Sequence, residues 1–196
     1  MSDVFFVKEY NNTLYAGVAE GFSSQQGNGF ILENNSTVWS GYQDDFCGDP
    51  INFFKINNID YLFVNDNSAT PKKLFYSNGT NWIHLDDNFY PDWGAKNIRD
   101  VEMFTTSNNV NHFVILANST GGNQTLYYYN NGDLSAGSLS LVCSILNTNT
   151  NILLERIKIL PYSIDNFKIL VGARPTANNV ITDFLFVVDP GNCSLS

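Results

Sequence analysis

The chain has 196 residues, a net charge of −9 and 43% hydrophobic residues, as expected of an acidic globular protein. Its 10 Lys and Arg residues form no run longer than the pair Lys72 and Lys73, so nucleic-acid binding is excluded for want of a basic surface. No apolar run approaches the roughly 18 residues of a transmembrane helix, and the N-terminal segment MSDVFFVKEY lacks a signal-peptide pattern, so we expect no membrane insertion.

A four-strand pattern recurs along the chain. Its clearest copy spans residues 51–85, where short apolar runs are separated by polar turns that include Asn78-Gly79, a strong hairpin signal. Four copies predict blades at residues 3–42, 51–85, 98–143 and 153–196, and the segment ILLERIKIL falls where the first strand of the fourth blade belongs. A period of about 50 residues is typical of propellers. The sequence therefore predicts a single all-β domain, a four-bladed β-propeller of four-stranded antiparallel meanders, with a β-sandwich as the alternative.

Two resemblances bear on this architecture. In size and blade number the predicted fold is similar to hemopexin-type propellers, but the aromatic and acidic consensus of that family is absent, so the resemblance implies the architecture alone. The small size, the 15% of charged residues and the strands rich in Asn, Tyr and Phe resemble structural proteins of archaeal viruses. This second resemblance implies a virion or extracellular surface protein, with a cytoplasmic location as the alternative.

Long polar loops and blade-to-blade links share one face of an antiparallel meander, and we expect function on that face. Two acidic links, QDDFCGDP and LDDNFYPDWG, and one loop of the second blade contribute aspartates to it. The candidate ligands of a Ca²⁺ ion are Asp44, Asp45, Asp49, Asp66, Asp86, Asp87 and Asp92. Ca²⁺ takes six to eight oxygen ligands, although this spacing matches no calcium-loop motif. The alternative is that these aspartates are solvated turn and capping residues.

Aromatic residues decorate the second of these links. Phe89, Tyr90 and Trp93 lie beside its carboxylates, an arrangement that suits a sugar ring or a protein contact. The alternative is that these rings pack the link onto the strands. Arg174 is a lone cation predicted on the same face, where it pairs with an aspartate or binds a ligand.

Motifs for catalysis and metal binding are absent from the sequence. It contains neither G-x-S-x-G nor H-E-x-x-H, and His84 and His112 fall in predicted strands, where we expect structural roles. The three cysteines form no metal motif. We expect Cys143 to be buried as a small apolar residue, and Cys47 is the candidate disulfide partner of Cys193.

These patterns predict a non-enzymatic structural or protein-interaction module that binds a protein partner or itself. A carbohydrate-binding propeller with Trp93 and Tyr90 at its site is the alternative. A propeller-type glycoside hydrolase, which needs two carboxylates facing each other across a central funnel, is the second alternative. Apart from the candidate Ca²⁺, no cofactor is expected. Sequons for N-glycosylation occur at Asn11, Asn34, Asn35, Asn78, Asn118, Asn123 and Asn192.

Overall fold

The computed structural model of the chain describes residues 2–20, 28–34, 38–56, 58–65, 73–77, 81–84, 97–106, 109–118, 123–130, 140–163, 166–176, 184–189 and 193–195. Every regular element within these residues is a β-strand. Among them, therefore, no helix has the length and apolar character needed to cross a membrane.

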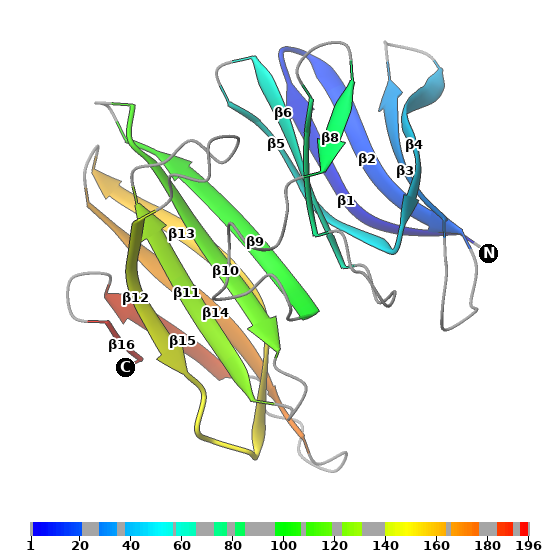
Figure 1. Cartoon of the computed structure of the whole chain (residues 1–196). Helices are drawn as coiled ribbons and strands as arrows, with labels where there is room; N and C mark the ends of the chain where they lie inside the picture. The colour runs from blue at the N-terminus through cyan, green and yellow to red at the C-terminus, as the bar shows by residue number, and fades with distance from the viewer. Residues whose placement is uncertain are drawn as a thin grey trace. The chain divides into compact units, whose positions relative to one another are not determined.

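The strands form four antiparallel sheets in which neighbours in sequence pair with each other (Figure 1). Sheet 1 contains β1 (Ser2–Tyr10), β2 (Thr13–Glu20), β3 (Asn28–Asn34) and β4 (Trp39–Cys47). Sheet 2 contains β5 (Asp49–Ile56), β6 (Ile59–Asn65), β7 (Leu74–Ser77) and β8 (Trp82–His84). Sheet 3 contains β9 (Asn97–Thr105), β10 (Asn111–Asn118), β11 (Gln124–Asn130) and β12 (Ser140–Leu146). Sheet 4 contains β13 (Ile152–Ser163), β14 (Asn166–Pro175), β15 (Phe184–Asp189) and β16 (Ser194–Leu195). The predicted all-β fold of repeated antiparallel meanders is confirmed, and the propeller arrangement stays a prediction.

The chain divides into two compact units, Met1–Ala95 with sheets 1 and 2 and Lys96–Ser196 with sheets 3 and 4. In the first unit the two sheets pack through a buried cluster of Tyr15, Ile31, Phe53, Leu62 and Val64. In the second unit a larger cluster joins β10, β11 and β12 to β13, β14 and β15. Its members include Val114, Leu116, Leu126, Cys143, Leu154, Ile157, Ile169 and Val188. Residues on the facing sides of the strands thus build the contact between two successive sheets.

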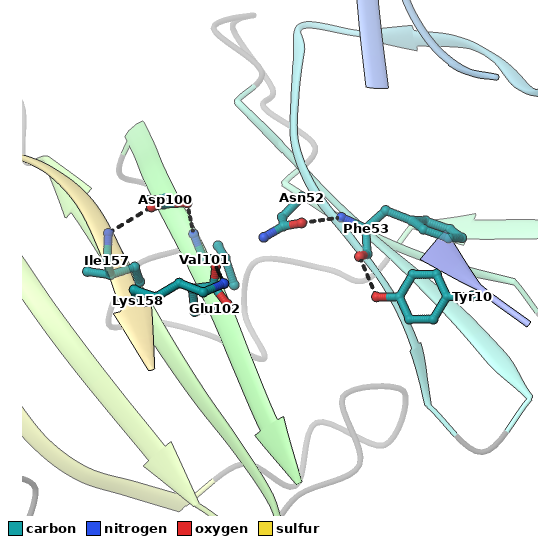
Figure 2. Close-up of polar contacts among 8 residues, drawn as sticks. All are labelled: Tyr10, Asn52, Phe53, Asp100, Val101, Glu102, Ile157 and Lys158. Carbon is teal, nitrogen blue, oxygen red and sulfur yellow. Dashed lines mark hydrogen bonds and ion pairs between the residues drawn. The ribbon is translucent and has the colours of Figure 1, made fainter. Parts of the chain in front are cut away.

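Hydrogen bonds also join the paired sheets (Figure 2). In the first unit, Tyr10 Oη donates to the Phe53 carbonyl at 3.0 Å, and the two rings meet edge to face. In the second unit, the Ile157 N–H donates to Asp100 Oδ2 at 2.8 Å, and Lys158 pairs with Glu102 at 3.0 Å. Each bond joins the first strands of two neighbouring sheets, β1 to β5 in the first unit and β9 to β13 in the second. These strands are therefore fixed relative to each other within a unit.

Asparagine turns connect strand pairs as the sequence predicts. The hairpin between β1 and β2 turns through Asn11 and Asn12, whose φ angles are 51° and 61°. Asn58 and Asn109 adopt φ angles of 63° and 62° before β6 and β10. Asparagine tolerates this left-handed region better than most residues that carry a side chain. The abundant asparagine is therefore partly explained by turn geometry.

The first strand of each sheet contains a β-bulge where its pairing with the second strand shifts. The extra residues occupy corresponding places in the four sheets: Phe5, Ile51, Arg99 and Glu155. A bulge increases the local twist and redirects the neighbouring side chains. Its recurrence in all four sheets identifies one structural unit that is repeated along the chain.

The connection between sheets 1 and 2 differs from the prediction. The sequence predicted a polar link, QDDFCGDP, outside the blades, whereas β4 continues through Asp44 and Asp45 and β5 begins at Asp49. Only Gly48 separates these strands, with a φ of 104° that strongly favours glycine. The prediction was wrong because an edge strand can carry polar residues without losing its pairing to β3.

Gly17 in β2 and Gly172 in β14 hold corresponding places in the repeat but have different surroundings, so alanine substitutions at the two positions can be compared. A methyl group at Gly17 would overlap the Phe6 ring, whereas at Gly172, which holds the corresponding place in sheet 4, the nearest atom is the Arg156 carbonyl oxygen at 3.8 Å. We expect Gly17→Ala to lower the free energy of unfolding by about 1–3 kcal/mol through overpacking. Gly172→Ala should change it by less than about 0.5 kcal/mol. Urea denaturation of both variants checks this, and equal losses would contradict it.

Candidate functional site

The side of sheet 1 that faces away from sheet 2 carries exposed apolar side chains. Directly paired residues of neighbouring strands lie on the same side of a sheet, so the register groups these residues. The set, called here the sheet 1 outer face, is Val4, Val7, Leu14, Val18, Leu32 and Trp39, of which Val18 and Leu32 are half-buried and the others exposed. Val4 is 62% exposed and Val7 is 56% exposed. Contiguous exposed apolar side chains on a rigid sheet are typical of an interaction surface.

Sheet 4 has a corresponding side that faces away from sheet 3. The register groups both apolar and basic residues there, and we call this set the sheet 4 outer face: Arg156, Lys158, Leu160, Lys168, Leu170, Leu185 and Val187. Leu185 is 66% exposed and Leu160 is 41% exposed. By register, four of the ten basic residues of the chain belong to this side when Arg174, which pairs with Leu153, is included, although the Lys158 ammonium group pairs with Glu102 of sheet 3. The two outer faces are therefore both apolar, but they differ in charge.

Arg174 lies in β14 rather than in the predicted loop. Its Nε donates to Glu155 Oε1 at 2.7 Å, so the expected pairing with an acidic residue is observed, although the partner is a glutamate. Both side chains remain substantially accessible, and such a surface pair contributes only about 0–1 kcal/mol. The Arg174–Glu155 pair therefore contributes little to the stability of the fold.

Most of the predicted calcium and aromatic residues lie outside the described residues. These are Asp66, Asp86, Asp87, Phe89, Tyr90, Asp92 and Trp93. Asp44 and Asp45 belong to β4, but their side chains lie outside the described part of the structure. Asp49 begins β5, where burial, with the negative charge of Asp3, raises the pKa of its carboxyl group.

A buried polar cluster lies between sheets 3 and 4. His112 Nδ1 and Tyr128 Oη are 2.8 Å apart, and both rings contact Phe167 of β14. Burial lowers the pKa of His112, which favours the neutral ring, and burial raises the pKa of Tyr128 to about 12. His112 is thus a strand residue with a structural hydrogen bond, as the sequence predicted.

Two thiols complete this cluster. Cys143 of β12 is buried, as predicted, and its thiol is hydrogen-bonded to that of Cys193, which is exposed just before β16. The pair was missed by sequence reasoning, which proposed Cys47 as the partner of Cys193 because a bond from this residue near the C-terminus would close the predicted ring. The side chain of Cys47 lies outside the described residues. The separation of the pair along the chain offers no local signal, and only the packing of sheet 3 on sheet 4 brings them together.

No three His, Cys, Asp or Glu side chains group into a metal site among the residues whose placement is described. The calcium, glycan and glycosidase hypotheses therefore stay predictions. Comparison of the chain with protein-family models and with curated protein sequences finds no match. The chain is thus characterised by its own features: four meanders, two sheet faces with exposed apolar side chains, and the neighbouring thiols of buried Cys143 and exposed Cys193.

Proposed function

We propose that the protein is a non-enzymatic structural module that assembles with copies of itself, and that the sheet 1 outer face is a contact surface. The exposure of Val4 and Val7 on a paired, rigid sheet carries this proposal. Burying apolar side chains releases about 25 cal/mol per Å² of their surface, so such a face gains free energy when a partner covers it. Self-assembly is also what the expected role in a virion requires.

The proposed occupant is the sheet 4 outer face of a second copy. Leu160 and Leu185 offer it an apolar centre, and Arg156 and Lys168 offer positive charge opposite Glu9 on the exposed side of β1. The halves of the chain also differ in charge. Residues 1–95 carry 12 acidic and 4 basic side chains, a net −8, and residues 96–196 carry 7 and 6, a net −1. This asymmetry favours a head-to-tail contact over one between like faces.

The predicted four-bladed propeller is the intramolecular form of the same contact. The recurring bulge supports four equivalent blades, and closing them into a ring would place the two outer faces of one chain against each other. In that case the two faces are buried against each other within the monomer and cannot bind a second copy. Assembly and ring closure therefore make opposite predictions for the mass in solution.

Val7→Asp is expected to dissociate the assembly. The wild-type chain should show a mass that is a multiple of 21.9 kDa by light scattering, and Val7→Asp should weaken association at least about tenfold, because it places a charge in an apolar contact. Val142→Asp is the matched control, since Val142 is an exposed valine of β12 in sheet 3. A wild-type monomer with a radius of gyration near 16 Å would sink self-assembly and favour the closed propeller.

Removal of metal ions is expected to leave this mass unchanged, because the proposed contact is apolar and needs no cation. The measurement is light scattering of the wild-type chain with and without EDTA. Dissociation to 21.9 kDa in EDTA would contradict the apolar contact. It would assign assembly instead to a cation held by the predicted aspartates, of which Asp44 and Asp45 would be the first to replace.

A further inference from the structure

We propose that Cys143 and Cys193 are a reversible redox pair whose disulfide joins the outer strand of sheet 3 to the last turn of sheet 4. Cys143 lies in β12, which is the edge strand of sheet 3, and Cys193 directly precedes β16, which is the edge strand of sheet 4. Their thiols are hydrogen-bonded, so the two sulfur atoms are neighbours before any bond forms. This modification is independent of the proposed assembly surface, which lies on other sides of the sheets.

The backbone of Cys193 supports the proposal. Its φ of 50° lies in the left-handed region, which glycine and asparagine adopt at little cost but other residues rarely adopt. A cysteine at such a place carries a backbone cost, and its thiol lies at the thiol of Cys143. Tyr128 pairs with Cys143 in the β11–β12 register. The charges of Cys143 and Cys193 both contribute to the raised pKa of Tyr128, so all three side chains lie close together.

The reaction needs an external two-electron oxidant, for which a small-molecule disulfide suffices. The exposed Cys193 thiolate attacks this disulfide, forms a mixed disulfide and releases one small thiol. The Cys143 thiolate then attacks Cys193 Sγ, forms the protein disulfide and expels the second small thiol. The two protons lost by the cysteines are taken up by the two leaving thiolates. One disulfide is thereby reduced to two thiols while one protein dithiol is oxidised.

The environment of Cys143 sets the pace of the second step. In the reduced chain, burial together with the hydrogen bond and charge of Cys193 raises the pKa of Cys143 to about 12; burial, the largest of these causes, still raises the pKa in the mixed disulfide, where Cys193 carries no charge. Because the thiolate is the nucleophile, Cys143 attacks slowly at neutral pH. We expect the mixed disulfide to accumulate near pH 7 and to resolve roughly tenfold faster per unit of pH.

The test uses the reduced full chain, oxidised with glutathione disulfide and then alkylated and digested with trypsin without reduction. The expected product links peptide 100–156, which holds Cys143, to peptide 169–196, which holds Cys193, while Cys47 in peptide 9–55 is alkylated. The oxidised chain should melt roughly 5–10 °C higher than the reduced chain, and dithiothreitol should reverse the shift.

Two variants separate this pair from other cysteine chemistry. Cys193→Ser should abolish the linked peptide and the shift in melting temperature, and Cys47→Ser should leave both unchanged. A link to Cys47, or a glutathione adduct at Cys193 that never resolves even at high pH, would overturn the proposal. The wild-type peptide map decides the question even if a variant folds poorly.

Discussion

Replacing Gln124 with leucine is expected to lower the free energy of unfolding by roughly 2–5 kcal/mol. Gln124 is 1% exposed, and its side-chain amide bonds both backbone groups of Leu154 in the neighbouring sheet. Nε2 donates to the Leu154 carbonyl at 2.7 Å, and Oε1 accepts the Leu154 N–H at 2.5 Å. Leucine has a similar volume but no polar atoms, so it would leave two buried backbone groups unpaired.

Urea denaturation at neutral pH measures this loss. The matched control is Thr125→Val, an exchange of similar size at the next residue, whose side chain is half-buried; it should change stability by less than about 0.5 kcal/mol. Both variants should keep the wild-type dependence on urea, because neither alters the surface that unfolding exposes. If Gln124→Leu lowered the free energy of unfolding no more than Thr125→Val does, the hydrogen bonds to Leu154 would make no net contribution to stability.

Gln124 belongs to a wider arrangement that covers the edge of sheet 4. β13 is an edge strand, and an uncovered edge leaves backbone groups without partners. Sheet 3 supplies those partners from its side chains: Gln124 bonds Leu154, and Asp100 accepts the N–H of Ile157. These contacts flank the bulge at Glu155, where regular pairing within sheet 4 is interrupted. Packing of the two sheets therefore depends on backbone capping as well as on apolar contacts.

Local sequence patterns predicted the strands and turns because their causes are local. The left-handed angles of Asn11, Asn12 and Asn58 follow from the tolerance of asparagine, and the apolar runs on either side become paired strands. The segment ILLERIKIL lies in β13, as its place in the repeat predicted, although its spacing also fits a helix. The repeat pattern outweighed local periodicity because each meander needs a first strand.

Contacts between sheets were not predictable from these patterns. The sequence placed function in long loops, yet the exposed apolar cluster lies on paired strands, where Val4 and Val7 read like ordinary core residues. The partner of Cys193 depends on how sheet 3 packs against sheet 4, and the polar composition of Asp44 and Asp45 concealed the end of β4. Which side of a strand is covered is decided by neighbours distant in the chain.

Asp100 is expected to make the protein less stable as pH rises through mildly acidic values. Burial raises the pKa of its carboxyl group from 3.8 to about 6, against the opposing effects of the Ile157 and Val101 N–H donors and of Arg156. The folded state therefore keeps a proton that the unfolded state releases between these two values. The stabilisation that protonated Asp100 contributes is fully present below the pKa of the unfolded state. It is lost as pH rises through the pKa of the folded state, which lowers the free energy of unfolding by roughly 3 kcal/mol.

Asp100→Asn isolates this contribution, because asparagine does not titrate and all other groups are unchanged. The free energy of unfolding of the wild-type chain minus that of the variant should fall by roughly 3 kcal/mol from about pH 3.5 to about pH 6.5, and then stay level. Denaturation at a series of pH values measures the difference, and the carboxyl ¹³C shift of Asp100 reports its titration directly. A difference that rises with pH would show that the two backbone donors outweigh burial. Asp100 would then be an ionised cap of β13, stabilised by the same N–H groups that hold it between the sheets.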